Sequence, residues 1–194
     1  MDRRDAIAWV RSVCQHELRA SQAKTLSVLV AAMLGVVRVS LANIGRSMLS
    51  EVLVKHRIKR AYRFIANEAV EAADAMRGVL RPLVKRWRKG FKNKPLLVSL
   101  DWTDVRGLQT LMAAAVIGGR AAPLVWASCT KHTYDGHRSR NAFEEALLLL
   151  LRTLIPGELG LEVVILADRG FGRTELGRFC QRYGFRYVIR IQPK

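Results

Sequence analysis

Acidic residues are scarce in this sequence. Its 194 residues include 16 aspartates and glutamates against 33 lysines and arginines, which gives a formal net charge of +17 at pH 7. A folded protein with this excess attracts polyanions, so we expect a nucleic acid as partner, with an anionic membrane surface as the second candidate. Residues 1–95 hold 20 basic and 7 acidic residues, and residues 96–194 hold 13 and 9. The first half is therefore the expected polyanion binder.

Cysteine and long apolar runs are also scarce. Cys14, Cys129 and Cys180 are odd in number, far apart and in no CxxC pair, which argues against a disulfide framework and a zinc site. This predicts reduced thiols in a cytoplasmic protein. The longest apolar stretches, residues 26–37 and 147–151, are shorter than the roughly 20 residues that cross a bilayer. With a charged N-terminus that does not resemble a signal peptide, the sequence predicts no membrane partner.

The apolar spacing of residues 1–90 is helical. Apolar residues recur every three to four positions between residues 7 and 18, which predicts an amphipathic helix over residues 5–19. Ser21 or Thr25 is expected to cap a second helix, and Ser40 to open a third. Two short helices joined near a glycine are compatible with a helix-turn-helix. A further helix is expected from Val70 to about residue 87, interrupted or kinked at Pro82.

Two segments of this half are densely basic. In residues 55–67 we expect Ile58, Ala61, Tyr62 and Ile65 to form the packed stripe of a helix, with the cations mainly off it. A packed face with a basic face is typical of a DNA-contacting helix, and the alternative is a solvated charged face. The second segment, residues 85–95, is interpreted as a linker that follows phosphates, with the domain boundary inside it. The expected DNA-binding residues of both segments are Lys55, Arg57, Lys59, Arg60, Arg63, Lys85, Arg86, Arg88, Lys89, Lys92 and Lys94.

From residue 96 the pattern predicts an α/β domain. Strands are expected over residues 96–102, 109–117 and 120–130, with a hairpin turn at Gly118-Gly119. A helix that starts at Ser139 or Asn141 and ends near residue 154 follows, then a strand over 162–168, a helix over 173–183 and a strand over 185–191. The order β-β-β-α-β-α-β predicts an antiparallel meander followed by parallel units.

Asp101 and Asp168 each follow a buried-type apolar run. An open α/β sheet carries its chemistry at the carboxyl ends of its strands, so the two carboxylates are expected to meet at one edge. Hard oxygen ligands of this kind suit Mg²⁺ or Mn²⁺, and paired ions of this type cut phosphodiesters. The alternative is that each aspartate only ends a strand and caps a turn.

The motifs around these two aspartates resemble those of one enzyme family. Residues 100–103 (LDWT) are similar to the D-x-T motif, and residues 166–171 (LADRGF) to the second motif, of cut-and-paste transposases of the IS-four insertion-sequence family. Residues 185–190 resemble the family's next strand, which often carries an arginine, and residues 60–64 resemble its N-terminal helical region. These proteins are DDE transposases with a ribonuclease H-like fold.

The resemblance implies a complete set of expectations. It implies an all-α DNA-binding domain over residues 1–90 and a ribonuclease H-like catalytic domain over residues 95–194. Asp101 and Asp168 would hold two Mg²⁺ or Mn²⁺ ions, and Arg169 and Arg190 would contact DNA. The implied partners are the double-stranded ends of a transposon, bound by a homodimer in the bacterial cytoplasm at the nucleoid.

One family feature is missing from this sequence. The third carboxylate, a glutamate in a downstream Tyr…Arg…Glu…Lys motif, is not found, and Glu144, Glu145 and Glu175 are expected to be surface helix residues. The chain is thus expected to be the N-terminal part of a transposase or a truncated copy, which binds DNA with steep salt dependence and cleaves it weakly or not at all.

Three other readings remain open at this point. The chain could be an inactive DNA-binding fragment that occupies transposon ends or inhibits the full-length protein. A ribonuclease H-like nuclease without the downstream glutamate would need another acid, for which Asp104 is the nearby candidate. A nucleotide-binding protein is disfavoured, because residues 170–172 lack the third glycine of a dinucleotide loop and the Lys-Ser/Thr of a P-loop.

Overall fold

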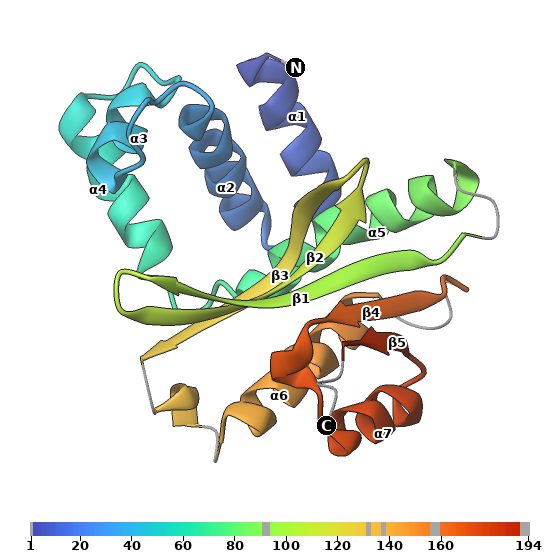
Figure 1. Ribbon diagram of the computed structural model, residues 1–194. Coiled ribbons are helices and arrows are strands. Elements are labelled where there is room, and N and C mark those ends of the chain that lie inside the picture. Colours follow the sequence, from blue (N-terminus) through green and yellow to red (C-terminus); the bar gives the residue numbers. More distant parts are fainter. Residues whose placement is uncertain (1, 91–93, 131–132, 137–138, 156–159, 191–194) are drawn as a thin grey trace. The chain divides into compact units, whose positions relative to one another are not determined.

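The computed structural model describes residues 2–90, 94–130, 133–136, 139–155 and 160–190. The chain divides into two compact units, residues 1–82 and residues 83–194, which are described separately below (Figure 1). Together they are an all-helical N-terminal part and a mixed five-stranded sheet with helices. Among the helices of the described residues, none has the length and apolar character that crossing a membrane requires.

The first unit contains four helices and the start of a fifth. Ser40 begins the third helix as predicted, since its Oγ accepts a hydrogen bond of 3.2 Å from the main-chain nitrogen of Asn43. The prediction that Ser21 or Thr25 caps the second helix is wrong, because that helix already begins at residue 20. The helices are α1 (Arg3–Cys14), α2 (Ala20–Met33), α3 (Leu41–Ser47), α4 (Val54–Ile65) and α5 (Ala72–Gly90).

Two apolar clusters hold this unit together. One joins α1 to α2 and the beginning of α5 around the buried residues Val10, Cys14 and Ala23. The other joins α2 to α3 and α4 around Leu29 and Ile44. Each helix buries one stripe of side chains, so the period of three to four in the sequence predicts which side of a helix is buried, and the packing of the helices decides what that side contacts.

Helices α3 and α4 approach each other closely at Gly45. A Cβ built on Gly45 would lie 2.5 Å from the Cα of Ile58, so only glycine permits this approach. The buried side of α4 is formed by Ala61 together with Phe64, which packs against the second cluster. The expected packed stripe is therefore partly wrong, because Tyr62 is 53% and Ile65 is 64% exposed. The stripe that packs is rotated toward Phe64, since α4 meets α2 and α3 on that side.

Helix α5 is longer than its charge pattern suggested. Residues 85–90, interpreted above as part of a linker, are helical as far as Gly90. The correction has a simple cause: Leu80, Val84 and Trp87 continue the helical apolar spacing through the basic run, and Leu80 and Val84 are buried. Pro82 lies inside the helix, where it removes one main-chain donor, and the two compact units divide directly after it. The boundary expected at 90–95 stays a prediction.

The second unit is built on a mixed sheet of order β3-β2-β1-β4-β5. The first three strands form the predicted antiparallel meander, and Gly118 and Gly119 turn the hairpin with φ angles of 56° and 75°. β4 pairs in parallel with β1, and β5 pairs in parallel with β4, as predicted. The strands are β1 (Leu96–Val105), β2 (Leu108–Ile117), β3 (Arg120–Thr130), β4 (Val163–Ala167) and β5 (Arg186–Ile189).

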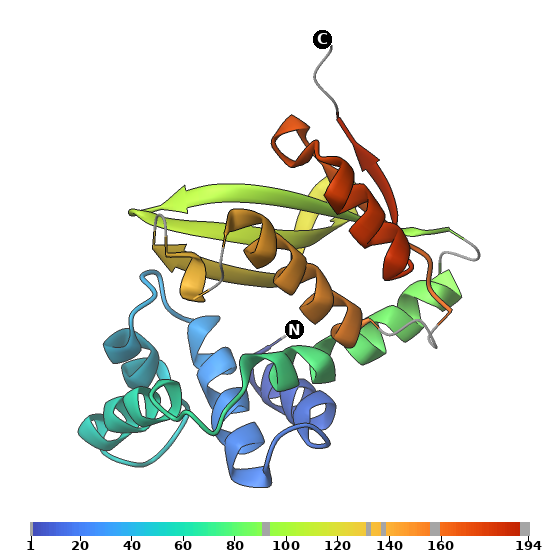
Figure 2. The same cartoon turned by 90° about the horizontal axis from the view of Figure 1, so that it is seen from below.

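Helices α6 (Arg140–Leu154) and α7 (Thr174–Arg182) lie on the same face of this sheet (Figure 2). Ser139 caps α6 as predicted, with its Oγ accepting from the main-chain nitrogen of Ala142 at 3.2 Å. Against these helices β1 presents Leu96, Val98 and Leu100, which are all buried. Successive residues of a strand point to opposite faces, so Asp101 belongs to the other face.

Candidate functional site

Asp101 and Asp168 occupy neighbouring positions where the parallel pairing of β1 with β4 ends. Asp168 follows the last residue of β4, as predicted, but Asp101 lies inside β1, which continues to Val105 because its pairing with β2 extends that far. Leu100 of β1 pairs with Ala167 of β4, and each aspartate is the next residue of its chain segment. Asp168 keeps an extended backbone, with φ −78° and ψ −178°, so the alternation of faces continues through it. Both aspartates therefore belong to the face opposite α6 and α7. Adjacent strands lie about 5 Å apart, which puts the two main-chain positions within reach of one small ligand.

The turn after β4 orients Asp168. Its Oδ1 accepts a hydrogen bond of 2.9 Å from the main-chain nitrogen of Gly170, and this caps a short 3₁₀ helix, η3 (Arg169–Phe171). Phe171 is 2% exposed and anchors that turn in the core. One oxygen of Asp168 is thus occupied locally, and the side chain as a whole remains exposed. Asp168 therefore caps the turn and also keeps an exposed carboxylate.

Three further residues align with Asp101 and Asp168 across the strands of the sheet, and the five positions are called one row below. Met112 of β2 pairs with Asp101, and Trp126 of β3 pairs with Met112. On the other side, Arg190 follows Ile189, which pairs with Ala167, so Arg190 stands next to Asp168. Trp126 is 53% exposed, and Arg190 is exposed. No pattern in the sequence points to Trp126, because only the register of β3 aligns it with the acids.

The donor set of this row fits one hard divalent cation. Two exposed carboxylates supply oxygen ligands, and Mg²⁺ is commonly held by one or two carboxylates with water and substrate phosphates completing its shell. Within the part of the chain that the structure describes, neither Asp101 nor Asp168 forms an ion pair. The described residues also contain no group of three or more acids, histidines and cysteines suited to a metal ion.

Asp104 does not join this pair. By strand alternation it faces away from Asp101, and its Oδ1 accepts a hydrogen bond of 3.0 Å from the main-chain nitrogen of Gly107. Asp104 therefore shapes the turn between β1 and β2. The reading in which Asp104 replaces the missing acid has no support from its position.

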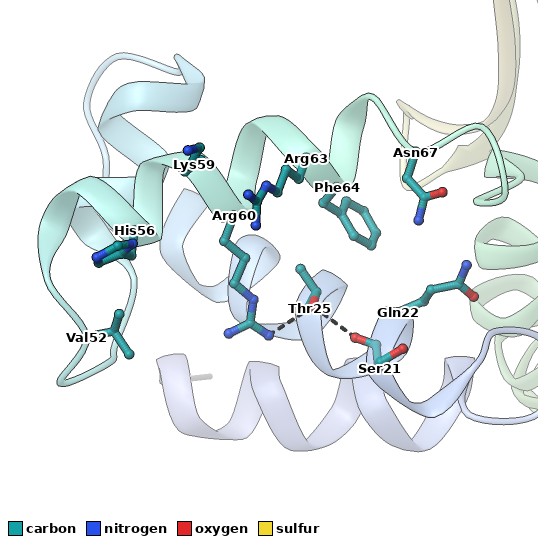
Figure 3. Close-up of a pocket in the computed structure, with 10 residues that line it drawn as sticks. All are labelled: Ser21, Gln22, Thr25, Val52, His56, Lys59, Arg60, Arg63, Phe64 and Asn67. Carbon is teal, nitrogen blue, oxygen red and sulfur yellow. Dashed lines mark hydrogen bonds between the residues drawn. The ribbon is translucent and has the colours of Figure 1, made fainter.

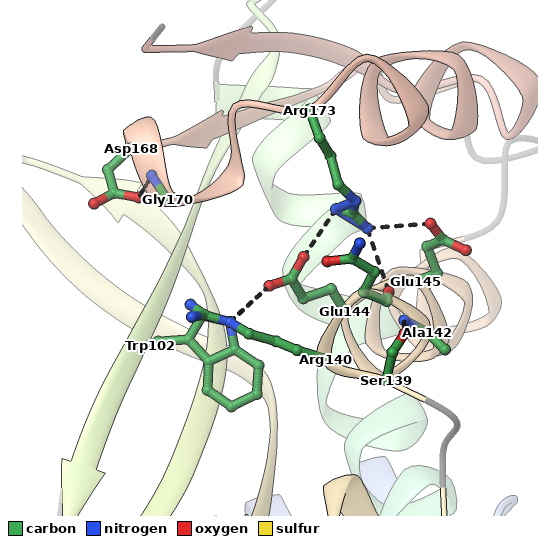
Figure 4. A network of polar contacts seen from close by, with 10 residues as sticks. Trp102, Ser139, Arg140, Ala142, Glu144, Glu145, Asp168, Gly170 and Arg173 are labelled. Carbon is green, nitrogen blue, oxygen red and sulfur yellow. Dashed lines mark hydrogen bonds and ion pairs between the residues drawn. The ribbon is translucent and has the colours of Figure 1, made fainter. Parts of the chain in front are cut away.

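A buried polar network lies behind the acids, on the helix-covered face (Figure 4). Its centre is Glu144 of α6, which is 2% exposed. Trp102 Nε1 donates a hydrogen bond of 2.9 Å to Glu144 Oε1, and Arg173 Nη1 donates one of 2.9 Å to Glu144 Oε2. The expectation that Glu144 is a surface residue is therefore wrong. The helical pattern of residues 140–154 could not reveal this, because the partners Trp102 and Arg173 come from distant segments of the chain.

Two more side chains complete the network. Arg140 Nε donates to Glu144 Oε1 at 3.3 Å, and its guanidinium lies 4.9 Å from the centre of the Trp102 ring. Arg173 Nη2 also contacts Glu145 at 3.1 Å and the main-chain oxygen of Asn141 at 3.3 Å. Glu144 therefore contacts β1 through Trp102, its own helix α6 through Arg140, and the segment after η3 through Arg173.

The first unit contains a basic groove between α2 and α4, with a volume of about 580 Å³ (Figure 3). Arg60 extends across it and donates a hydrogen bond of 2.9 Å to Thr25 Oγ1 of α2. Of the described residues that line the groove, none is acidic. The groove can therefore accept an anion. Its lining residues are Ser21, Gln22, Thr25, Val52, His56, Lys59, Arg60, Arg63, Phe64 and Asn67.

The other expected DNA-binding residues are dispersed. Lys55 is exposed on α4 but does not line the groove, and Arg57 turns its guanidinium toward α3, donating to the main-chain oxygen of Met48 at 2.7 Å. Arg169 is exposed on η3. Lys92 lies outside the described residues. Lys85, Arg86, Arg88 and Lys89 are on α5, and Lys94 lies two residues before the start of β1.

Cys14, Cys129 and Cys180 are all buried. The chain matches neither the protein-family models nor the curated proteins with which it was compared.

Proposed function

We propose that this chain is a DNA-binding protein of the transposase type, with a ribonuclease H-like second unit whose Asp101 and Asp168 serve phosphodiester chemistry. The observation that carries the proposal is the neighbouring position of these two exposed carboxylates, directly after the last pair of the parallel register of β1 with β4. Two acids that are 67 positions apart in the sequence have no local reason to lie side by side.

The order of elements supports the same proposal. Three antiparallel strands are followed by two parallel ones, each preceded by a helix, and this is the order that the resemblance to ribonuclease H-like proteins implies. An α/β sheet of this type binds its ligand at the carboxyl ends of its strands. Asp168 lies directly after the carboxyl end of β4, and Asp101 lies next to it inside β1. Both aspartates belong to motifs similar to those of IS-four transposases.

The proposed chemistry is in-line displacement at phosphorus. An incoming oxygen, from water or from a DNA 3′-hydroxyl, bonds to the phosphorus while the bond to the 3′ oxygen of the cut strand breaks, and that oxygen leaves as a 3′-hydroxyl after protonation. A divalent ion bound by Asp101 and Asp168 would supply positive charge to the phosphate and lower the pKa of the attacking group. Arg190, next to Asp168 in the row, would add a charge-assisted contact to a phosphate oxygen.

The basic groove supports the DNA-binding half of the proposal. Lys59, Arg60 and Arg63 line it from one helix, and Ser21 and Thr25 add neutral polar groups from the opposite wall. Such a set suits phosphates, whose contacts position a protein on DNA without reading its sequence. Transposon ends as the DNA, a homodimer as the acting form and a bacterial nucleoid location are part of this proposal.

The test uses the full 194-residue chain with duplex DNA and Mg²⁺. Fluorescence anisotropy measures binding, and gel analysis of end-labelled DNA measures cutting, for the wild type, Asp101→Asn and Asp168→Asn. Asp104→Asn is the matched control, because it removes one charge from the same strand on the opposite face. We expect DNA binding in all four proteins and any Mg²⁺-dependent cutting only in the wild type and the control. Cutting by Asp168→Asn at the wild-type rate would contradict the proposal.

A second candidate rests on the number of acids. Only two converge among the described residues, and loss of one of three ligands is expected to cost much of the rate. The chain would then act by occupying DNA ends or by inhibiting a complete transposase. In that case Asp101→Ala would leave DNA binding and inhibition unchanged, and the wild type would show no cutting.

A further inference from the structure

We propose that Glu144 is the positioning residue of the Asp101–Asp168 pair, and that its network holds the two aspartates at a fixed separation. This inference rests on the proposed function, because it concerns the same carboxylates. It assigns a role to a buried acid that lies on the opposite face of the sheet and does not itself touch the ligand.

The placement of the partners carries the argument. Trp102 is the residue after Asp101, and Arg173 follows Asp168 by five positions, with the buried Phe171 between them. Glu144 binds both, at 2.9 Å each. The Glu144 carboxylate of α6 therefore bonds to the chain segment next to each aspartate (Figure 4). Helix α6 itself contributes no residue to the row of the sheet that contains Asp101 and Asp168.

Glu144 is well suited to set a distance. Each of its oxygens bonds to a different segment, Oε1 to β1 through Trp102 and Oε2 to the segment after η3 through Arg173. The charged bond to Arg173 is of the strong, short kind, and because Glu144 is only 2% exposed, water does not compete for it. Arg173 is itself fixed a second time by the main-chain oxygen of Asn141. The part of β1 next to Asp101 and the segment after the η3 turn are thus both bonded to Glu144.

Glu144 is not a direct ligand in this arrangement. Both of its oxygens are engaged by donors, and its partner Trp102 points to the face opposite Asp101 by strand alternation. Two arginines also contact it, at 3.3 Å from Arg140 and 2.9 Å from Arg173, which leaves no free negative charge to offer a cation. Its effect on the acids passes through the backbone of β1 and of the η3 turn.

Mn²⁺ binding tests the proposal without relying on catalysis. Electron paramagnetic resonance of free Mn²⁺ measures the dissociation constant of the full-length chain, below the melting temperature of every variant compared. Glu144→Gln keeps an oxygen for Trp102 but removes the charge that Arg173 requires. Trp102→Phe keeps an aromatic ring beside Phe143 and Arg140 but removes the Nε1 donor together with part of the indole, so it serves if Glu144→Gln does not fold. Glu145→Gln is the matched control, because Glu145 also contacts Arg173 but its side chain is 33% exposed, and among the described residues it forms no ion pair with β1.

We expect Glu144→Gln and Trp102→Phe to weaken Mn²⁺ binding roughly 10- to 100-fold, the range found when groups that orient metal ligands are removed. Glu145→Gln should stay within about twofold of the wild type. A purely structural role would lower the melting temperature of the variants and leave the Mn²⁺ affinity of the folded protein unchanged, and that result overturns the inference. If the wild type does not bind Mn²⁺, or if Asp168→Asn binds it equally well, the proposed function is wrong, and the role of Glu144 falls with it.

Discussion

Arg57 donates a hydrogen bond of 2.7 Å to the main-chain oxygen of Met48, which is the residue that ends α3. A second, longer contact of 3.4 Å reaches the main-chain oxygen of Arg46. Arg57 therefore satisfies carbonyl groups at the end of a helix, where unpaired acceptors are otherwise left. Its neighbours Lys59 and Arg63 instead line the groove between α2 and α4. Cations that look equivalent along α4 thus divide into one that supports the fold and others that are available to a ligand.

The first prediction concerns the cations of the groove. Lys59→Gln and Arg63→Gln should each reduce the dependence of the logarithm of DNA affinity on the logarithm of salt concentration by about 1, because each removes one phosphate contact. Fluorescence anisotropy over a series of NaCl concentrations measures this slope. Lys24→Gln, on the exposed side of α2 and outside the groove, makes the same charge change and should leave the slope unaltered. Equal slopes in all three variants would show that the groove is not part of the DNA interface.

The second prediction concerns Arg57. Arg57→Gln should lower the free energy of unfolding by about 1.5–3 kcal/mol, since it removes a hydrogen bond from a charged donor to a partly buried carbonyl. Urea denaturation followed by circular dichroism gives this value. Lys55 is an exposed cation two residues before Arg57 on the same helix. Lys55→Gln should therefore change the free energy of unfolding by no more than about 0.5 kcal/mol. A stable Arg57→Gln that loses DNA affinity would instead assign Arg57 to the interface.

The third prediction concerns the close approach of α3 and α4. Gly45→Ala should destabilise the first unit by about 1–3 kcal/mol, because the new Cβ would lie 2.5 Å from the Cα and 2.8 Å from the main-chain nitrogen of Ile58. These are backbone atoms, so the clash is relieved only by moving a helix. Gly90→Ala at the end of α5, where no atom lies within 4 Å of the new Cβ, is the control. Thermal unfolding of the two variants compares them directly, and equal melting temperatures would contradict the packing described here.

The fourth prediction concerns Cys180. Burial raises the pKa of the Cys180 thiol from its ordinary value of 9.0 to about 11, and nearby Arg173 opposes this only in part. Because the folded state holds the proton more tightly, its contribution to stability is complete below pH 9 and is lost as the pH rises from about 9 to about 11. At pH 8 the native thiol should resist iodoacetamide, since the thiolate is the reactive form.

A variant that retains only Cys180 makes this measurable. Cys14→Ala with Cys129→Ala removes the other two thiols, and mass spectrometry then follows alkylation of Cys180 in the native and in the denatured protein. Slow native alkylation that accelerates on denaturation is the expected result. Equal rates in both states would show that Cys180 is accessible and that its pKa is not raised.

The sequence by itself determined the local structure of this protein. The spacing of apolar residues predicted the helices and strands and their order, because an amphipathic helix or a buried strand repeats within a few residues. The caps at Ser40 and Ser139 and the hairpin at Gly118-Gly119 were predicted as well, since each depends on one side chain or one backbone conformation. The strand-end position of Asp168 belongs to the same class of local features, whereas β1 continues past Asp101 to Val105.

Only the tertiary structure decided what these elements bring together. The pairing of β1 with β4 puts Asp101 beside Asp168, and the helix-covered face gives Glu144 its buried partners. The contacts of α4 likewise exposed Tyr62 and Ile65 and turned Arg57 away from its basic neighbours. Each of these outcomes depends on residues that are distant in the chain and meet only when strands pair and helices pack. A local pattern carries no information on which distant partner a side chain will meet.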